Sequence, residues 1–451
     1  MTTAQRILMR ARRGMRLTAG AGVLLAASAC QSILDVKNPN NIPESSLDNP
    51  AAATAEANGL LASTTQMLGA TTVVYADATD EMDWIGSRDA WGELDQGIIG
   101  DFVNEFSNGA FPIVAQARYL SDKTIERLEG FDKDGTLKSK SDLMRSYLYG
   151  AVVYASIADM YDDFAFSNKT IPAAPIGRAA MGTLYDKAVG WLDKALALAT
   201  TNADKYNILA WRARVKHGKA VWSKVTPKGS AAPANPLVND AGAVADANAA
   251  LAVGSDASEF SLVNNVEATA GINVWFEVNG RNESSPGKAY VVDPTNTANK
   301  YVAALKDPIS NTADARLQAR LTAFKNFGTT SGTLWITNSR ELRLILAEAA
   351  LAAGNTAEFT NQINIVRAQD GKPAFSGQIS NLAMLTYERQ VELWLMRRRL
   401  MDMYRFGIKD TKWAASANYD SAFNQVGLLF PIAYVERISN PCVTDATACS
   451  K

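Results

Sequence analysis

The sequence predicts a fold dominated by α-helices, arranged as irregular helix pairs with long loop insertions and a few short strands. Two observations predict it. Apolar residues recur at three- and four-residue spacing over most of the chain, which is typical of amphipathic helices. Polar segments containing Gly and Pro separate these stretches and read as loops. Hydrophobic residues make up 47% of the 451 residues, enough to bury a sizeable core.

The first 29 residues predict an export signal. Five arginines and no acid precede a small, apolar segment over residues 17–29, which is too short to span a hydrocarbon core of about 30 Å. The run Ala27-Ser28-Ala29-Cys30 resembles the end of a bacterial lipoprotein signal. That resemblance implies a signal peptide at 1–29 and acyl chains such as palmitate on Cys30. The alternative is an ordinary secretory signal cut after Ala29, which leaves Cys30 free. Residues 30–50 are polar and Pro/Asn-rich and are expected to form a lipidated tether.

The first half of the folded part predicts six helices. Residues 51–68 are Ala-rich, 111–130 end at a glycine, and 142–166 carry an apolar stripe. The segments 184–199 and 207–225 form a helix pair, the first beginning after Thr183 as a fair N-cap. A short Ala-rich helix is expected at 241–253.

The second half predicts one strand and three helices. Residues 273–278 look like a short strand before the turn-rich segment 279–282. Residues 334–353 and 356–369 read as a helix pair around Gly354-Asn355, and 382–406 as one last long helix stopped by Gly407. The helix pairs resemble tetratricopeptide hairpins, which hide their apolar stripes by stacking. We therefore expect a single domain over 51–451, interrupted by insertions at about 69–109 and 255–335 that carry the function.

Several segments together resemble the SusD/RagB family of outer-membrane nutrient-binding lipoproteins. In chain order they are LDVKNPN at 34–40, SRELRLILAEA at 339–349 with Gly354-Asn355, INIVRA at 363–368, ERQVEL at 388–393 with Arg399, Asp402, Arg405 and Gly407, and LFPI at 429–432 with Glu436 and Asn440-Pro441. Their order and spacing cover essentially the mature chain. The chain departs from the family at Met396-Arg397-Arg398, where the family often has Glu-Gly-His.

The predicted last helix carries charged residues on one face. Glu388, Glu392, Arg399 and Asp402 recur at helical spacing among apolar neighbours, which indicates partly buried structural ion pairs with Arg340, Arg343 and Glu348 as possible partners. The sharper alternative is a catalytic carboxylate pair of Glu388 and Glu392. Retaining glycosidases need two carboxylates about 5–5.5 Å apart across a cleft, and two acids one turn apart on one helix do not straddle a substrate. We therefore predict no enzymatic activity and no catalytic residue.

Aromatic and polar residues in the insertions are the candidate ligand contacts, because sugars are held by aromatic faces flanked by hydrogen-bonding side chains. The candidates in the first insertion are Tyr75, Asp80, Trp84, Arg88 and Trp91, and those in the second are Arg281, Asn282, Tyr290 and Trp335. For each tryptophan the structural alternative is core packing.

Other residues limit the chemistry. The acidic cluster Asp77, Asp80, Glu81 and Asp83 is not an EF-hand loop and is expected to be a solvated loop without metal. The lone His217 excludes a two-histidine zinc site and is expected on the surface or in packing. Export favours a disulfide between Cys442 and Cys449. No cofactor is predicted.

The charge balance argues against nucleic-acid binding. The net charge is -1 for the whole chain and -6 from Cys30 onward, since the five arginines lie in the signal. The family resemblance implies a protein of the outer membrane, lipid-anchored and facing the exterior, that binds oligosaccharides or other nutrients and delivers them to a SusC-like, TonB-dependent barrel transporter. The alternative hypothesis is a tetratricopeptide-type envelope scaffold that binds only protein partners.

Overall fold

The computed structural model describes residues 44–168, 171–226, 228–264, 273–329 and 331–450. The predicted signal peptide and Cys30 lie outside these ranges. The chain divides into two units, Met1–Ala52 and Ala53–Lys451. In the first unit, the described end of the predicted tether forms the short helix α2 (Glu44–Leu47) and the 3-10 turn η1 (Pro50–Ala52).

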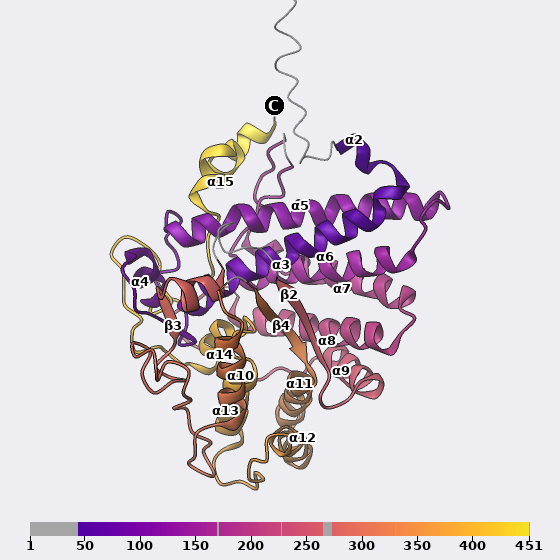
Figure 1. Ribbon diagram of the computed structural model, residues 1–451. Helices are drawn as coiled ribbons and strands as arrows, with labels where there is room; N and C mark the ends of the chain where they lie inside the picture. Colours follow the sequence, from indigo (N-terminus) through magenta and orange to yellow (C-terminus); the bar gives the residue numbers. More distant parts are fainter. Residues whose placement is uncertain (1–43, 169–170, 227, 265–272, 330, 451) are drawn as a thin grey trace, which may run out of the picture. The chain divides into compact units, whose positions relative to one another are not determined.

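The first half of the second unit is a stack of antiparallel helices. Figure 1 shows these helices, coloured from indigo to pink, side by side, with each helix packed against its neighbours in the chain. Their bounds are α3 (Ala53–Asp77), α5 (Glu105–Lys133), α6 (Lys140–Met160), α7 (Thr183–Leu198), α8 (Asn202–Val225) and α9 (Ala241–Val253). Gly150 allows the close packing of α6, because a Cβ there would lie 2.8 Å from Ile125 and 2.9 Å from Trp191. The six helices expected in this part of the chain are all present, with shifted ends.

Helix α3 continues nine residues beyond its predicted end at Leu68. Thr71 and Thr72 lie in this continuation, and their hydroxyls donate to the carbonyl oxygens of Met67 and Leu68, at 2.8 and 2.6 Å. These bonds within the helix satisfy the polar groups, so the threonines are buried rather than placed in a loop. The first insertion therefore begins after Asp77.

The second half contains a further helix pair, α11 (Ser339–Ala352) and α12 (Thr356–Ala368), packed beside α9. Each helix begins with an asparagine cap: Asn338 accepts from the backbone of Glu341, and Asn355 from that of Glu358. The predicted start at Leu334 was wrong, because residues up to Asn338 form strand β4 (Gly332–Asn338). This strand pairs antiparallel with β2 (Glu259–Asn264).

Two more predictions need correction. Residues 273–278 form helical turns, not a strand: Asn273 caps the backbone of Phe276, and a π-turn, η4, spans Phe276–Gly280. The last long helix is broken into α13 (Asn381–Glu392) and α14 (Arg399–Phe406). Leu395 and Arg397, between them, adopt the left-handed backbone with φ of 58° and 56°, which no continuous helix allows. The charged residues therefore lie on two elements rather than on one face.

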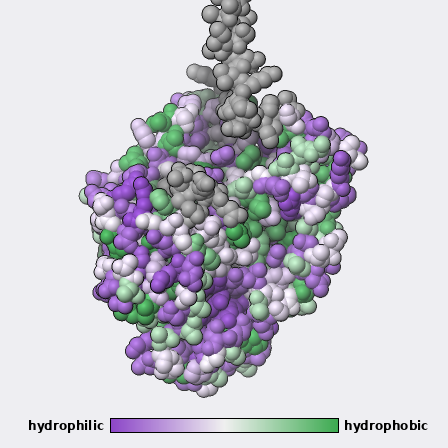
Figure 2. Space-filling view, viewed as in Figure 1, coloured by the Kyte–Doolittle hydropathy of each residue, from purple (hydrophilic) through white to green (hydrophobic). Residues whose placement is uncertain are grey.

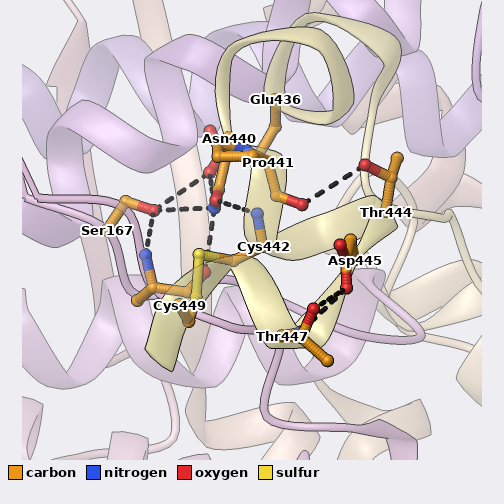
Figure 3. Close-up of a disulfide and its surroundings, with 10 residues drawn as sticks. Ser167, Glu436, Asn440, Pro441, Cys442, Thr444, Asp445, Thr447 and Cys449 are labelled. Atoms are coloured by element: carbon orange, nitrogen blue, oxygen red, sulfur yellow. Dashed lines mark hydrogen bonds between the residues drawn. A yellow bond between two sulfur atoms is a disulfide. The ribbon is translucent and has the colours of Figure 1, made fainter. Parts of the chain in front are cut away.

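The remaining elements complete the unit. They are β1 (Met82–Trp84), α4 (Asp89–Asp95), η2 (Arg178–Ala180), β3 (Ser284–Pro286), α10 (Ala315–Asn326), α15 (Tyr434–Ser439), α16 (Pro441–Thr444) and η5 (Ala446–Ser450). Cys442 and Cys449 form a disulfide across α16 and η5. Figure 3 shows that Asn440 anchors this segment, because its side chain donates to Ser167 and Glu436 and accepts from the Cys442 backbone.

Candidate ligand-binding surface

A two-stranded ribbon joins the two predicted insertions. β1 pairs antiparallel with β3, so that Trp84 lies opposite Ser284 and Met82 opposite Pro286. The contact continues past the strand, because the backbone N–H groups of Ile85 and Gly86 both donate to the Glu283 carbonyl oxygen. Segments about 200 positions apart in the sequence are thereby held side by side.

Glu283 fixes the start of α4. Its buried carboxylate accepts from the backbone N–H groups of Ser87 and Arg88, at 2.9 and 3.1 Å. These groups precede the first turn of α4, where helix donors lack internal partners, and a carboxylate is favourable there. The backbone that carries Arg88 is therefore anchored by the second insertion.

Trp84 and Arg88 are both partly exposed at this ribbon. The Trp84 indole packs on Gly92 of α4, where a Cβ would lie 2.8 Å from the ring. The Arg88 guanidinium lies 4.5 Å from the centre of the Phe106 ring and pairs with Glu105. An aromatic ring at the end of β1 and a cation directly before α4 are therefore both partly open to solvent.

Arg281 and Asn282 approach the same ribbon from the second insertion, directly before Glu283 and β3. Both are exposed. Arg281 lies 5.3 Å from the Phe276 ring centre and 3.6 Å from the Glu277 carboxylate. Asn282 adopts φ 59°, and its side-chain oxygen accepts from Lys300 at 2.7 Å. Trp84, Arg88, Arg281 and Asn282 are hereafter called the ribbon surface.

The other five candidates lie elsewhere. Tyr75, Trp91, Tyr290 and Trp335 are at most 5% exposed and belong to the core. Trp91 stacks on Phe106 with ring centres 3.6 Å apart. Asp80 is partly exposed, but both of its oxygens accept from Arg399, at 2.7 and 2.6 Å. These five residues are therefore buried or already paired, and they do not belong to the ribbon surface.

The acidic cluster beneath β1 is not a solvated loop, so that expectation was wrong. Asp77 and Glu81 are at most 1% exposed, and Asp83 pairs with Lys412. Burial raises the pKa of Glu81 to about 8, although the Leu395 N–H that it accepts at 2.7 Å acts in the opposite direction. Burial likewise raises the pKa of Asp77 well above its usual range. Within the described residues, no group of three His, Cys, Asp or Glu side chains is placed to hold a metal ion.

Glu388, Glu392, Arg399 and Asp402 all form buried ion pairs. Glu388 binds Arg367 and Lys372, Glu392 binds Arg316 and Arg340, and Asp402 binds Arg389 and Arg405. Of the possible partners named from the sequence, only Arg340 pairs with this set; Arg343 binds Asp256, and Glu348 binds Arg405 instead. The carboxylates of Glu388 and Glu392 are thus sequestered among cations in the interior.

His217 lies in the core, 2% exposed, with its Nε2 3.0 Å from Glu348. Burial lowers the pKa of His217, which favours the neutral ring. The same Glu348 carboxylate accepts from Arg405 and from the backbone of Val238. The lone histidine is therefore a packed, hydrogen-bonded core residue.

The fold defines the chain as a helical-repeat protein with two loop insertions. The β1–β3 ribbon joins these insertions, and the candidate residues that reach solvent lie there rather than on the repeats. Residues 273–427 match the model of the SusD family. A SusD superfamily protein from Bacteroides fragilis is 16% identical with a TM-score of 0.59, over 88% of this chain and 99% of that chain. A second, from Bacteroides vulgatus, is 15% identical with a TM-score of 0.56, over 88% and 98%.

A laminarin-binding SusD-like protein is 12% identical with a TM-score of 0.52, over 86% of this chain and 97% of that chain. No curated protein sequence matches the chain significantly. Residues 273–427 therefore resemble the SusD family, and the chain shares the fold of SusD superfamily proteins. In the part of the chain that the structure describes, no helix has the length and apolar character needed to cross a membrane.

Proposed function

We propose that this protein binds oligosaccharides at the ribbon surface and delivers them to a SusC-like, TonB-dependent barrel transporter, while anchored to the outer membrane through lipid on Cys30 and facing the exterior. The observation that carries the proposal is the convergence of Trp84, Arg88, Arg281 and Asn282 on one β-ribbon. The partly exposed indole offers an apolar face to a sugar ring, and the flanking polar groups bond the hydroxyls of that sugar.

The chemistry of the surface favours capture without reaction. The two exposed cations are paired with Glu105 and Glu277. The carboxylates of Glu388 and Glu392 are buried in structural ion pairs, so neither carboxylate is open to a substrate. A binding role requires only the positioned surface. The solved relatives described as carbohydrate-binding and laminarin-binding support a glycan as the ligand class.

The first experiment is a glycan array on the purified chain, followed by titration of each hit. We expect at least one neutral oligosaccharide to bind. A pull-down from outer-membrane extract, with the lipidated chain as bait, is expected to recover a barrel transporter. Absence of binding to any glycan, together with recovery of protein partners other than a barrel, would favour the envelope-scaffold hypothesis.

A further inference from the structure

A cavity lies apart from the ribbon surface, and none of the four residues of that surface lines it. It has a volume of about 490 Å³ and lies where the start of β2, α10 and the start of α11 meet. Three arginines line it: Arg316 and Arg320 from α10, and Arg340 from α11. Figure 2 shows hydrophilic residues gathered over this part of the face. The volume falls within the range of about 300–1,000 Å³ that small-molecule sites occupy.

The acids around the cavity are already engaged. Glu392 accepts from the Arg316 Nε at 3.1 Å and from Arg340 at 2.9 Å, and Arg340 also binds Asp370. Glu259 accepts from the Arg320 Nη2 at 2.5 Å. Asp256 pairs with Arg343, at 2.9 Å. Each of these carboxylates is therefore already paired with an arginine.

Donors, by contrast, remain in excess. Among the described residues, the two Nη groups of Arg316 and the Nε and Nη1 groups of Arg320 make no hydrogen bond. The side-chain amide nitrogen of Gln369, which also lines the cavity, is buried without a partner there. The Gln369 nitrogen is a buried donor without an acceptor, which is unfavourable, and the free arginine groups line the same cavity. A ligand that brings oxygen acceptors would satisfy these donors together.

Arg320 is rigidly placed for this role. Its side chain is 7% exposed and lies 4.1 Å from the centre of the Trp335 ring. Burial and the neighbouring Arg316 lower the pKa of Arg320 to about 10, although Glu259 and Glu392 act in the opposite direction. The two cations therefore repel each other, and an anion between them would relieve that repulsion.

We infer that this cavity binds a small oxyanion, the carboxylate or sulfate group of an acidic sugar or a free anion of the same chemistry. Arginine is suited to this, because its planar fork donates two parallel hydrogen bonds to a carboxylate or sulfate. The inference is independent of glycan binding at the ribbon surface.

The test is titration calorimetry of the full purified chain with sodium D-glucuronate, sodium sulfate and, as a neutral control, D-glucose. We expect glucuronate to bind, with an affinity that falls as salt is added, and glucose to bind at least about tenfold more weakly. Sulfate that displaces glucuronate would assign the site to the oxyanion itself. Failure of sulfate to displace it would show that the sugar ring adds contacts.

Two variants and two controls decide the location. Arg316→Gln removes free donors while keeping the ion pair between Arg340 and Glu392. Gln369→Glu places a negative charge in the cavity, which would repel an anionic ligand. Each is expected to weaken glucuronate binding by about tenfold or more, since charged hydrogen bonds carry that much affinity. Arg145→Gln, at an arginine of α6 that pairs with Asp142 and does not line the cavity, and Trp84→Ala, at the ribbon surface, should leave glucuronate binding unchanged.

The inference is overturned if neither anion binds the folded wild-type chain, or if glucose binds as well as glucuronate. It is also overturned if both cavity variants bind normally, or if Trp84→Ala abolishes glucuronate binding, which would move the site to the ribbon surface. Circular dichroism and melting curves establish that each variant is folded.

Discussion

At the scale of single residues, burial distinguishes candidate ligand contacts that look equivalent in the sequence. Trp84 and Trp91 lie seven positions apart in one insertion, and both are candidate ligand contacts on composition alone. The structure stacks Trp91 on Phe106 at 0% exposure but leaves part of Trp84 open at the end of β1. No local sequence signal distinguishes them, because the difference arises from the helix α5 that covers one of the two rings.

Trp91→Ala is therefore expected to destabilise the fold. Loss of a fully buried tryptophan removes its contacts and leaves a cavity, which typically costs about 3–5 kcal/mol. Chemical denaturation monitored by circular dichroism measures the change in the free energy of unfolding. A stability equal to that of the wild type, combined with lost ligand binding, would show that Trp91 contacts ligand directly.

At the scale of elements, the break between α13 and α14 is the feature that periodicity could not predict. Apolar and charged residues continue through the break at helical spacing, so the sequence reads as one helix. The buried Glu81 carboxylate accepts the Leu395 N–H, and Arg397 donates to Thr72 on α3. These distant contacts hold the left-handed residues in place.

Glu81→Gln is expected to change how stability depends on pH. Between its ordinary value of 4.5 and its folded value of about 8, Glu81 keeps a proton in the folded state that the unfolded chain has lost. The wild-type chain should therefore lose stability as pH rises through this window, with a slope from this group of at most about 1.4 kcal/mol per pH unit. Glutamine does not titrate, so the variant lacks this loss.

Urea denaturation of both chains across the window measures the difference, and other titrating groups cancel in the comparison. The free energy of unfolding of the variant should rise steadily relative to that of the wild type as pH rises through this window. Parallel curves would show that Glu81 is ionised in the folded state at neutral pH.

The C-terminal disulfide is expected to act on its own segment only. It closes a loop with a sequence separation of 7 between Cys442 and Cys449, outside the helix stack. In a double Cys442→Ser, Cys449→Ser variant, hydrogen exchange should rise in residues 441–450, while protection in α3 and α6 stays as in the wild type. Loss of protection throughout α6 would mean that the bond supports the whole fold.

At the scale of the whole molecule, the sequence predicts the helix stack but does not predict the ribbon surface. Helices such as α7 and α9 follow from apolar spacing and agree closely with prediction. The pairing of β1 with β3 joins three-residue strands about 200 positions apart, and such short strands carry no periodicity. The family resemblance supplied the expected fold and the proposed ligand class, whereas the pairing that brings Trp84 and the segment of Arg281 to one ribbon required the structure.

The proposed lipid anchor gives a prediction at this scale. Cys30→Ser removes the predicted site of acylation, and stable anchoring depends on acyl chains. We expect the variant to move from the membrane to the soluble fraction on cell fractionation, with an unchanged circular dichroism spectrum. Retention in the membrane fraction after a high-salt wash would refute lipid attachment at Cys30.

The central claim, that the ribbon surface holds the glycan, is tested most directly by calorimetric titration of the best array hit into three chains: wild type, Trp84→Ala and Tyr434→Ala. Tyr434 is the matched control, an aromatic side chain 44% exposed on α15. We expect Trp84→Ala to bind the glycan about tenfold more weakly than the wild type, or weaker still. Tyr434→Ala should bind as the wild type does. Equal affinity in the wild type and Trp84→Ala would contradict the claim.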